Sequence, residues 1–384
     1  MKNYVFDQIV NQCGDIVFEK SIEGVLKSAT PGEWVSLESK KSNKSYIGYA
    51  NPFRTDGRVV RIVCERYAAF DANGYVAKKV SSAIEFRQKF LGEKGARLFF
   101  GSSDGIPGLV IDKFKNVIVI QYHMLGVLAV REAILSVLGQ YYPDMKLCES
   151  AKPESGEEMQ AMECVFPEFI EIEEQGIDYR ISRERFQKTG FYYDHRSNRT
   201  RLFNFYKSKS ITPTKVLDLY SYLGSWSVPF HYYLGSSITC VDQADLELEF
   251  KQIFSRYPTS TKSRFVRSSV SKYLDEVSEE FDLIICDPPA FKKGQDKKRE
   301  ALNGYDSLVK KIVPKLKVGS GFAFSSCTHG IEHKDLDALV SKAAHRVGKK
   351  LQLVDMGLQD IDHPMMSLND KSMYIKYLLY ICKE

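Results

Sequence analysis

Residues 215–242 read KVLDLYSYLGSWSVPFHYYLGSSITCVD, and this stretch decides the fold. A short apolar run, a loop with one glycine, a helix-length segment and a second apolar run follow one another. The alternation continues through FDLIICDPP and SGFAFSSCT. Strands that alternate with helices form a parallel sheet. We therefore expect an α/β, doubly wound, Rossmann-like domain, with helices over 225–234, 243–256, 268–276 and 300–317.

Acidic residues stand where the first two of these runs end, and ligands of such sheets bind at the carboxyl ends of the strands. Asp218 could accept hydrogen bonds from the ammonium group of a ligand. Gly224 has no side chain, so the backbone of its loop can approach a ligand closely. Asp242 stands where an acidic residue binds two ribose hydroxyls. The two runs therefore predict a nucleoside-binding site.

The composition of the first loop distinguishes between two cofactors. A nicotinamide-dependent oxidoreductase would also use Asp242, but it would normally carry GxGxxG to bind a pyrophosphate. The loop SYLGSW has one glycine. S-adenosylmethionine has no phosphate, so the sequence favours this cofactor. Tyr220, Ser221 and Gly224 are the loop candidates, and Ser269 follows the third run, where many enzymes of this architecture carry an acidic residue for the adenine amine.

The run FDLIIC is followed by DPPAF, which predicts a site for a nucleobase. Prolines stop a strand and stiffen the loop after it. Asp287 can hydrogen-bond a ring nitrogen or an amine of a base. Phe291 can stack on an extruded base, and Pro288 lies between them in the sequence. A simple strand-terminating turn is the structural alternative.

A cysteine at the end of a later run predicts covalent chemistry. Cys327 lies in SSCTH, at a carboxyl end, whereas Cys286 lies inside an apolar run and is expected to be buried. Carbon-5 of a pyrimidine is a poor nucleophile. A thiolate that adds to carbon-6 turns the ring into an enamine that can take a methyl group. The sequence thus indicates Cys327 as the nucleophile, against the alternative of a structural cysteine.

Length and composition set the wider limits. A chain of 384 residues is expected to form two or three domains. The net charge of +5 permits nucleic-acid binding without requiring it. No apolar run is long enough to span a membrane, the start does not resemble a signal peptide, and the absence of CxxC makes a zinc site improbable. We expect a protein of the reducing cytoplasm without a bound metal.

The N-terminal half has a different pattern. Residues 31–70 contain β-branched and aromatic runs separated by turns, which predict a small β-barrel or meander. Residues 79–94 have helical spacing, with Ile84, Phe86 and Phe90 expected near one face. Strands are expected in RLFFG, LVIDKF and NVIVIQYH, followed by a helix over 125–140. The polar stretch 151–162 is expected to be an exposed loop or linker.

The chain resembles the bacterial large-subunit ribosomal RNA cytosine-5 methyltransferases of PUA–EEHF–methyltransferase architecture. The resemblance covers roughly residues 30–384, and the block at 187–199 is its most specific part. The N-terminal 30 residues lack the family's usual His-Pro-Trp start. The matching segments are GSSDGIPGLVIDKF (101–114), QKTGFYYDHR (187–196), VLDLYSYLGSWSV (216–228), DPPAF (287–291), SSCTHG (325–330), DHP (362–364) and YIK (374–376).

This resemblance implies a PUA-like RNA-binding β-barrel over 1–75, an α+β middle domain over 76–184 and a class I methyltransferase domain over 185–384. It implies large-subunit ribosomal RNA as partner, no membrane, and in some members a homodimer. It also implies that one segment wraps the methionine end of S-adenosylmethionine, through Lys188, Thr189, Gly190, Phe191, Asp194 and Arg196.

Together these points predict an S-adenosylmethionine-dependent enzyme that forms 5-methylcytidine in 23S ribosomal RNA. Cys327 would add to carbon-6, and Asp287 would hold or protonate the ring nitrogen. Two alternatives stay open beside the nicotinamide enzyme. One is an N-methyltransferase acting on a guanine or adenine, for which Cys327 is dispensable. The other is a non-catalytic RNA-binding protein.

Overall fold

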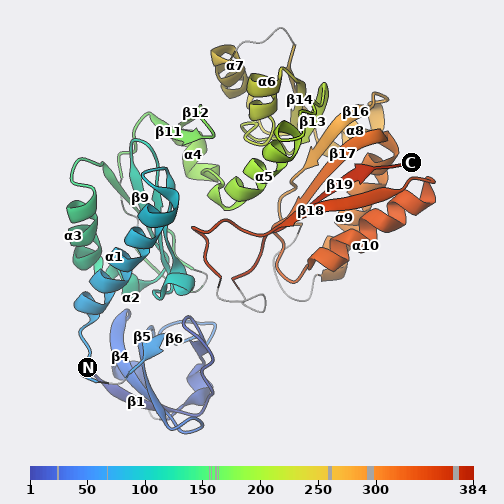
Figure 1. Ribbon diagram of the computed structural model, residues 1–384. Coiled ribbons are helices and arrows are strands. Elements are labelled where there is room, and N and C mark those ends of the chain that lie inside the picture. Colours follow the sequence, from blue (N-terminus) through green and yellow to red (C-terminus); the bar gives the residue numbers. More distant parts are fainter. Residues whose placement is uncertain are drawn as a thin grey trace. The chain divides into compact units, whose positions relative to one another are not determined.

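The computed structural model describes residues 1–384 except 24–25, 67, 155, 157, 161, 163, 258–261, 292–297 and 366–371. The chain forms two compact units, which we describe separately. The first unit consists of Met1–Ile172, Ser182–Thr189 and Ile361–Met366; the second consists of Glu173–Ile181, Gly190–Asp360 and Ser367–Glu384. Figure 1 labels the elements of both.

The second unit is built on a seven-stranded sheet within the described residues, in the order β15-β14-β13-β16-β17-β19-β18. Strands β13 to β17 run parallel to one another, whereas β19 is antiparallel to both β17 and β18. The predicted doubly wound α/β sheet is confirmed. Its strands are β13 (Lys215–Leu219), β14 (Ser237–Asp242), β15 (Arg264–Arg267), β16 (Phe281–Cys286), β17 (Leu316–Ser326), β18 (Leu351–Gly357) and β19 (Lys376–Cys382).

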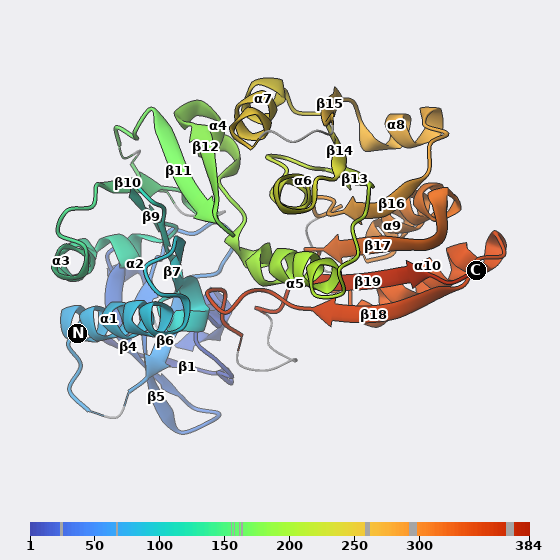
Figure 2. The same cartoon turned by 45° about the horizontal axis from the view of Figure 1, so that its top comes forward.

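Helices cover both faces of this sheet, as the apolar character of its strands requires. In Figures 1 and 2, α8, α9 and α10 lie on one side of the strands and α5 and α6 on the other. In α9 the buried residues recur at helical spacing and pack into the core with the sheet. The four predicted helices correspond to α6–α9. The helices are α5 (Arg196–Lys207), α6 (Val228–Leu234), α7 (Glu247–Arg256), α8 (Val270–Glu276), α9 (Lys298–Ile312) and α10 (His333–Arg346).

The strand order creates one switch point in the sheet. β13 pairs with β14 on one side and with β16 on the other, with Leu219 opposite Val241 and Cys286. The chain therefore leaves these strands at one edge and turns in opposite directions. Ligands of open α/β sheets bind at such an edge. Asp218, Asp242 and Asp287 all lie at this edge or one residue beyond it.

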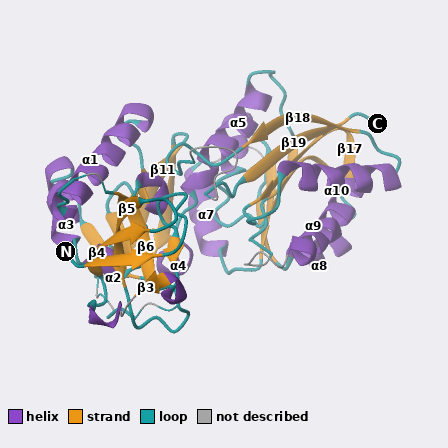
Figure 3. Cartoon of the chain, turned by 90° about the horizontal axis from the view of Figure 1, so that it is seen from below, coloured by secondary structure: helices purple, strands orange, loops and turns teal. Residues whose placement is uncertain are grey.

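The first unit begins with a six-stranded sheet in the described residues, in the order β2-β6-β5-β4-β1-β3, seen from below in Figure 3. The runs predicted within 31–70 form β4, β5 and β6, although Tyr67 lies outside the described residues. The two- to four-residue strands near the start were not predicted. The six strands are β1 (Asn3–Phe6), β2 (Ile16–Val17), β3 (Ile22–Glu23), β4 (Glu33–Ser39), β5 (Lys44–Ala50) and β6 (Val60–Glu65).

A second sheet of the first unit packs against helices. Its described strands have the order β10-β9-β8-β7, and their apolar residues share a core with α1 and α3. The predicted strands are confirmed, and the helix predicted over 125–140 is divided into α2 and α3. The elements are α1 (Ala72–Leu91), β7 (Ala96–Phe100), β8 (Leu109–Lys113), β9 (Ile118–Tyr122), α2 (Leu125–Leu128), α3 (Arg131–Tyr141) and β10 (Leu147–Ala151).

One prediction about α1 is wrong. Ile84 is fully buried, whereas Phe86 and Phe90 are 40% and 54% exposed, so the three residues do not share a face. The buried side chains of this helix are Val76, Val80, Ala83, Ile84 and Arg87. Their spacing defines the inward face, and positions 86 and 90 fall outside it.

Three further elements lie, in the sequence, between the sheet of β7–β10 and the seven-stranded sheet. A two-stranded sheet is formed by β11 (Phe169–Glu174) and β12 (Ile177–Ser182), and α4 (Arg183–Thr189) follows. The stretch predicted as a loop, 151–162, contains residues outside the described set, and its first residue ends β10. Within the described residues, no helix combines the length and the apolarity needed to cross a membrane.

Candidate active site

The loop after β13 has an unusual backbone. Tyr220, Tyr222 and Gly224 all have left-handed conformations, with φ values of 60°, 48° and 73°. A non-glycine residue in this region costs on the order of 1 kcal/mol, and such residues cluster at ligand sites. The alternation turns the backbone sharply between the strand and α6. A reversal of the chain direction alone would not need this conformation, which is typical of a ligand site.

Asp242 fixes this loop from the neighbouring strand. Its Oδ2 accepts a hydrogen bond from the Tyr222 amide at 3.1 Å, and its Oδ1 accepts one from the Ala244 amide at 2.8 Å. A carboxylate has about four acceptor positions, so capacity is left for two hydroxyl donors. The Tyr222 hydroxyl also donates to the Gly190 carbonyl at 2.8 Å. Tyr222 therefore joins the loop, the end of β14 and the segment that begins at Gly190.

Asp218 lies beneath the loop and is fully buried. Ser227 Oγ donates to its Oδ2 at 2.5 Å, and among the described residues its Oδ1 has no hydrogen-bond partner. Burial raises the pKa of this carboxyl to about 8, the Ser227 hydrogen bond lowers it, and the nearby Asp287 and Asp242 raise it further. An unpartnered buried carboxyl oxygen is suited to accept from a cationic ligand group.

The segment from Gly190 to Arg199 is held by a buried ion pair. Arg199 is 2% exposed and donates to both oxygens of Glu174 at 2.5 and 2.6 Å, and also to the Tyr192 carbonyl at 2.8 Å. Its guanidinium also lies 5.4 Å from the centre of the Phe191 ring. This pair fixes the backbone at 191–192, which was predicted to wrap the cofactor.

Asp194 and Arg196 extend the same segment through the short 3-10 helix η4 (Tyr193–His195). Asp194 Oδ2 accepts from the Tyr374 hydroxyl at 2.8 Å, and Arg196 Nε lies 3.6 Å from Asp360 Oδ2. Both side chains are therefore engaged with the C-terminal part of the second unit. Lys188 and Thr189 lie in α4, but their side chains are outside the described set.

Two hydrogen bonds and a histidine contact hold Asp287. Ser325 Oγ donates to its Oδ1, Trp226 Nε1 donates to its Oδ2 at 3.1 Å, and His195 Nε2 lies 3.4 Å from Oδ1. The side chain is still 22% exposed. Since its oxygens are fixed and one edge stays open, this carboxylate can present an acceptor in a set direction to a polar ligand.

Cys327 follows β17 directly and is held on both sides by α9. The Tyr305 hydroxyl lies 2.7 Å from both Ser326 Oγ and Thr328 Oγ1, the neighbours of Cys327 in the chain. Cys327 itself is partly exposed. Burial raises the pKa of its thiol to about 11, and the carboxylates of Asp287 and Asp194 contribute to the rise. The expected burial of Cys286 is confirmed, since it is fully buried.

Two predicted contacts have other roles in the structure. Ser269 caps α8, where its Oγ accepts from the Lys272 amide at 3.4 Å. The Phe291 ring packs edge-on against Tyr305 at 4.7 Å and also lies against Gly304 of α9. Pro288 is buried. A contact of Phe291 with a base stays a prediction.

Sequence reasoning missed four residues of this site: Tyr222, His195, Trp226 and Lys376. Tyr222 and Trp226 lie inside the loop after β13, His195 lies in η4 and Lys376 begins β19, so none of them stands at the carboxyl end of a predicted strand. Trp226 and His195 pack together, with their rings 5.3 Å apart. Both lie inside segments that carried the family resemblance, and this was the one available signal.

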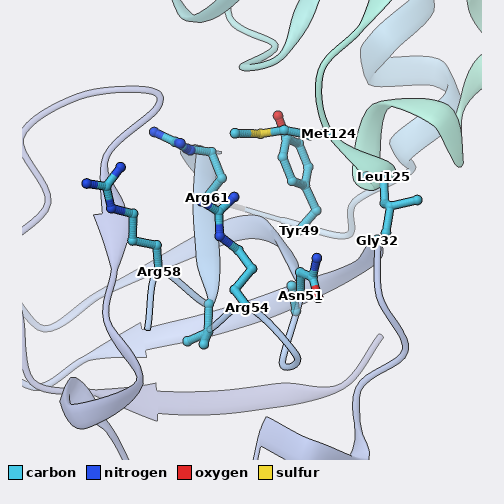
Figure 4. A pocket seen from close by; sticks show the side chains of 11 residues that line it. Gly32, Tyr49, Asn51, Arg54, Arg58, Arg61, Met124 and Leu125 are labelled. Atoms are coloured by element: carbon cyan, nitrogen blue, oxygen red, sulfur yellow. The ribbon is translucent and has the colours of Figure 1, made fainter. Parts of the chain in front are cut away.

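The first unit has a separate basic pocket at its N-terminal sheet. Figure 4 shows the side chains of Arg54, Arg58 and Arg61 gathered beside Tyr49 and Met124. Arg54 donates to Asp56 at 2.7 and 3.0 Å, and Arg61 donates to Glu154 at 2.6 and 2.8 Å. Arg58 is 47% exposed. Among the described residues, these three guanidinium groups thus share two carboxylates.

Comparisons with known proteins bear on the fold. No family model matches the chain. Ribosomal RNA large subunit methyltransferase I of Yersinia pseudotuberculosis is 29% identical over 298 residues, which are 74% of each chain. A Streptococcus mutans protein assigned to the SAM-dependent methyltransferases has a TM-score of 0.74 at 19% identity, over 99% of this chain and 100% of that one.

This chain shares the fold of that methyltransferase. A methyltransferase structure with the same TM-score, identity and coverage was solved with S-adenosylhomocysteine bound. Trm5b of Pyrococcus abyssi has a TM-score of 0.52 at 12% identity, over 71% of this chain and 75% of that one. The predicted Rossmann-like class is therefore confirmed at the level of fold.

Proposed function

We propose that this protein is an S-adenosylmethionine-dependent methyltransferase that forms 5-methylcytidine in large-subunit ribosomal RNA through a covalent adduct with Cys327. One observation carries the proposal: a fixed carboxylate and a partly exposed thiol stand at the ends of two adjacent parallel strands. Cys286 of β16 pairs with Phe324 of β17, so the next residues, Asp287 and Ser325, are neighbours. Cys327 lies two positions beyond Ser325.

The residues around the β13 loop fit the proposed cofactor. Asp242 has acceptor capacity for a ribose diol, and the unpartnered oxygen of Asp218 suits a cationic group. Gly190, Phe191, Asp194 and Arg196 would hold the methionine end, as the family resemblance implies. The backbone of Tyr220, Ser221 and Gly224 would line the site of the nucleoside, and Ser269 would contact the adenine. When bound, S-adenosylmethionine supplies an electrophilic methyl group next to a positive charge.

Asp287 and Cys327 would act on the base. Asp287 holds or protonates the ring nitrogen of the cytosine. The thiolate of Cys327 forms a bond to carbon-6, and the displaced π electrons make carbon-5 nucleophilic. After methylation, loss of the carbon-5 proton and cleavage of the sulfur–carbon bond restore the aromatic ring. Pro288 stiffens the loop under the base, and Phe291 is the candidate for stacking.

RNA would be held by the first unit. We propose that residues 1–75 are a PUA-like domain and 76–184 a middle domain of EEHF type. Arg58 and Arg61 of the basic pocket are suited to phosphate oxygens, since guanidinium groups bind them bidentately. The relatives' name supports ribosomal RNA as the substrate. A homodimer and a cytoplasmic location follow from the resemblance and the composition, and stay predictions.

The experiment is methyl transfer from labelled S-adenosylmethionine to unmodified large-subunit ribosomal RNA, followed by mass spectrometry of the nucleosides. The expected product is 5-methylcytidine, formed by the unaltered protein and not by the Cys327→Ala variant. A methylated guanosine or adenosine would overturn the role of Cys327 and leave the cofactor assignment standing. Cofactor binding without transfer to naked RNA or to ribosomal particles would overturn the substrate assignment.

A further inference from the structure

Lys376 is a buried lysine beside the proposed nucleophile. It begins β19 and stands opposite Ser326 of β17 in the antiparallel register. Its side chain reaches across the strand pair, and Nζ donates to the Thr328 carbonyl at 2.6 Å and to the Tyr374 carbonyl at 2.7 Å. Lys376 is 1% exposed. The ammonium group therefore lies one peptide unit from Cys327, sealed from water.

Within the part of the chain that the structure describes, no carboxylate balances this charge. Among the described residues, no Asp or Glu oxygen lies within 4.0 Å of Lys376 Nζ. Burial lowers the pKa of the Lys376 ammonium to about 8, while Cys327 and Asp335 of α10 act in the opposite direction. Lysines are rarely fully buried without a paired charge, because desolvation of an ammonium group is costly. Its position needs an explanation beyond packing.

The groups around Cys327 supply that explanation. Burial, Asp287 and Asp194 all raise the pKa of the thiol, whereas Lys376 and the Ala290 backbone amide lower it. Tyr192 and Tyr305 lie within electrostatic range of the same thiol and are neutral. Burial lowers the pKa of the His329 and His333 imidazoles, and the nearby charge of Lys376 lowers both further. Lys376 is thus the cationic side chain in these described surroundings that favours a thiolate.

We propose that Lys376 is a positioning residue that supplies the counter-charge for the Cys327 thiolate during attack on the base. This inference rests on the proposed function. The thiol gives its proton to solvent, its sulfur electron pair forms the bond to carbon-6, and the ring nitrogen takes up a proton as the π electrons shift. When the sulfur–carbon bond breaks, the pair returns to sulfur, and Lys376 stabilises the departing thiolate as well.

A purely structural role makes a different prediction. In that case Lys376 only ties Thr328 to Tyr374, and any side chain that donates to these carbonyls replaces it. Lys376→Gln keeps an amide donor and removes the charge, whereas Lys376→Arg keeps the charge. Lys349 offers a matched control, because its Nζ donates to the carbonyls of Pro314 and Leu316, and Leu316 starts the same strand β17.

The test is the rate at which iodoacetamide alkylates Cys327, followed by mass spectrometry of its peptide from pH 6 to 10, without RNA or cofactor. Alkylation needs the thiolate, so the loss of one favourable charge is expected to slow it about tenfold at pH 7 in Lys376→Gln. Lys376→Arg and Lys349→Gln are expected to stay within about twofold of the unaltered protein. Cys13, Cys64 and Cys164, which are partly exposed, serve as internal references.

The pH profile adds a signature that a structural tie would not give. Above pH 8 the ammonium of Lys376 increasingly loses its proton, so a thiolate that forms by proton loss to solvent no longer has its counter-charge. The alkylation rate of the unaltered protein is therefore expected to rise by less than tenfold per pH unit just above pH 8, while that of Lys376→Gln rises by about tenfold per unit. Equal rates and equal profiles in the two proteins, with melting temperature and S-adenosylhomocysteine binding retained, would overturn the proposal.

Failure of this inference and failure of the proposed function are distinguishable. The alkylation experiment reports on the thiol alone and needs no substrate. Methyl transfer by Cys327→Ala would contradict the proposed function, whatever the effect of Lys376 on the thiol. If Lys376→Gln does not fold, the shallower rise above pH 8 in the unaltered protein and the rate in Lys376→Arg still decide the question. An alkylation rate that rises tenfold per pH unit from pH 8 to 9 contradicts the counter-charge.

Discussion

Two buried cations of the second unit differ in how their charge is balanced. Arg199 is 2% exposed and has a carboxylate, Glu174, on two of its nitrogen atoms. Lys376 is 1% exposed and donates to two backbone carbonyls. A paired charge fixes a conformation, whereas an uncompensated charge opposes folding. We interpret the first as part of the framework and the second as part of the chemistry.

The carboxyl groups at the strand ends differ in the same way. Asp242 accepts two backbone amides, which hold it in a single orientation. Asp218 has one hydroxyl donor, and burial raises its pKa to about 8. The strained loop of Tyr220 and Tyr222 lies between them. Features that oppose folding thus gather at this edge of the sheet, as expected where ligands complete the interactions.

The largest expected effect is on the chemistry itself. Cys327→Ala removes the proposed nucleophile, so methyl transfer is expected to fall by at least about 10³-fold. Cys286→Ala is the matched control, because Cys286 is fully buried one residue before Asp287 and its thiol cannot reach a ligand. Transfer to ribosomal RNA is measured together with binding of S-adenosylhomocysteine. Full activity in Cys327→Ala would mean that the thiol, and with it the charge of Lys376, takes no part in the reaction.

The second expected effect is on stability. Arg199→Ala leaves the buried Glu174 carboxylate without its partner, so the free energy of unfolding is expected to fall by about 3–5 kcal/mol. Arg201→Ala is the control, because Arg201 is 49% exposed in its pair with Asp355 and the loss is expected to stay below about 1 kcal/mol.

Urea unfolding of both variants measures this difference. Equal losses would mean that the Arg199–Glu174 pair does not form the framework of the 191–199 segment. In that case the distinction between paired and unpaired buried charges would no longer separate structure from chemistry.

The third effect has the opposite sign. Burial lowers the pKa of Lys376 to about 8 in the folded chain, from an ordinary value of 10.5. Between these values the unfolded chain binds more protons, so the stability contributed by this lysine rises with pH. At pH 7 its charge opposes folding by at most about 3 kcal/mol. Lys376→Gln is therefore expected to be as stable as the unaltered protein at pH 7, or more so.

Chemical denaturation at pH 7, 8, 9 and 10 tests this prediction. The advantage of Lys376→Gln should shrink as the pH rises from 8 towards 10.5, with Lys349→Gln as the reference for other alkaline effects. A large loss of stability at pH 7 that does not vary with pH would identify Lys376 as a structural tie.

The sequence was informative where a motif directly follows an apolar run. Asp242, Asp287 and Cys327 follow parallel strands, so their place at one edge of the sheet could be predicted from the strand pattern. The places of His195, Trp226 and Lys376 could not be predicted in this way. His195 precedes α5, Trp226 lies several residues into the loop after β13, and Lys376 begins the antiparallel strand β19. Periodicity failed for α1 as well, where Phe86 and Phe90 have an apolar composition and an exposed position.

The short strands near the start escaped prediction for a related reason. β2 and β3 have two residues each, too few for any alternation to be visible. Their pairing depends on strands outside any local window, since β2 pairs with β6, far along the chain, and β3 pairs back with β1. Local pattern carries little information about such contacts.

The smallest expected effect concerns the basic pocket of the first unit, where the arginines have carboxylate partners. Arg58→Gln and Arg61→Gln each remove one proposed phosphate contact, so each should weaken RNA binding by about 1 kcal/mol and reduce the salt dependence of log Kd by about one contact. Arg66→Gln is the control, because Arg66 donates to Ser36 and the Ala68 carbonyl and does not line the pocket.

Fluorescence anisotropy with labelled ribosomal RNA fragments at several salt concentrations measures both quantities. The two variants should lose affinity equally for different sequences, because phosphate contacts carry no base information. The salt slope is the sharper criterion, since a folding defect would lower the active fraction and leave that slope unchanged. An unchanged slope in both variants would mean that Asp56 and Glu154 neutralise the pocket fully. The arginines of the pocket would then resemble Arg199, as paired charges that stabilise the structure.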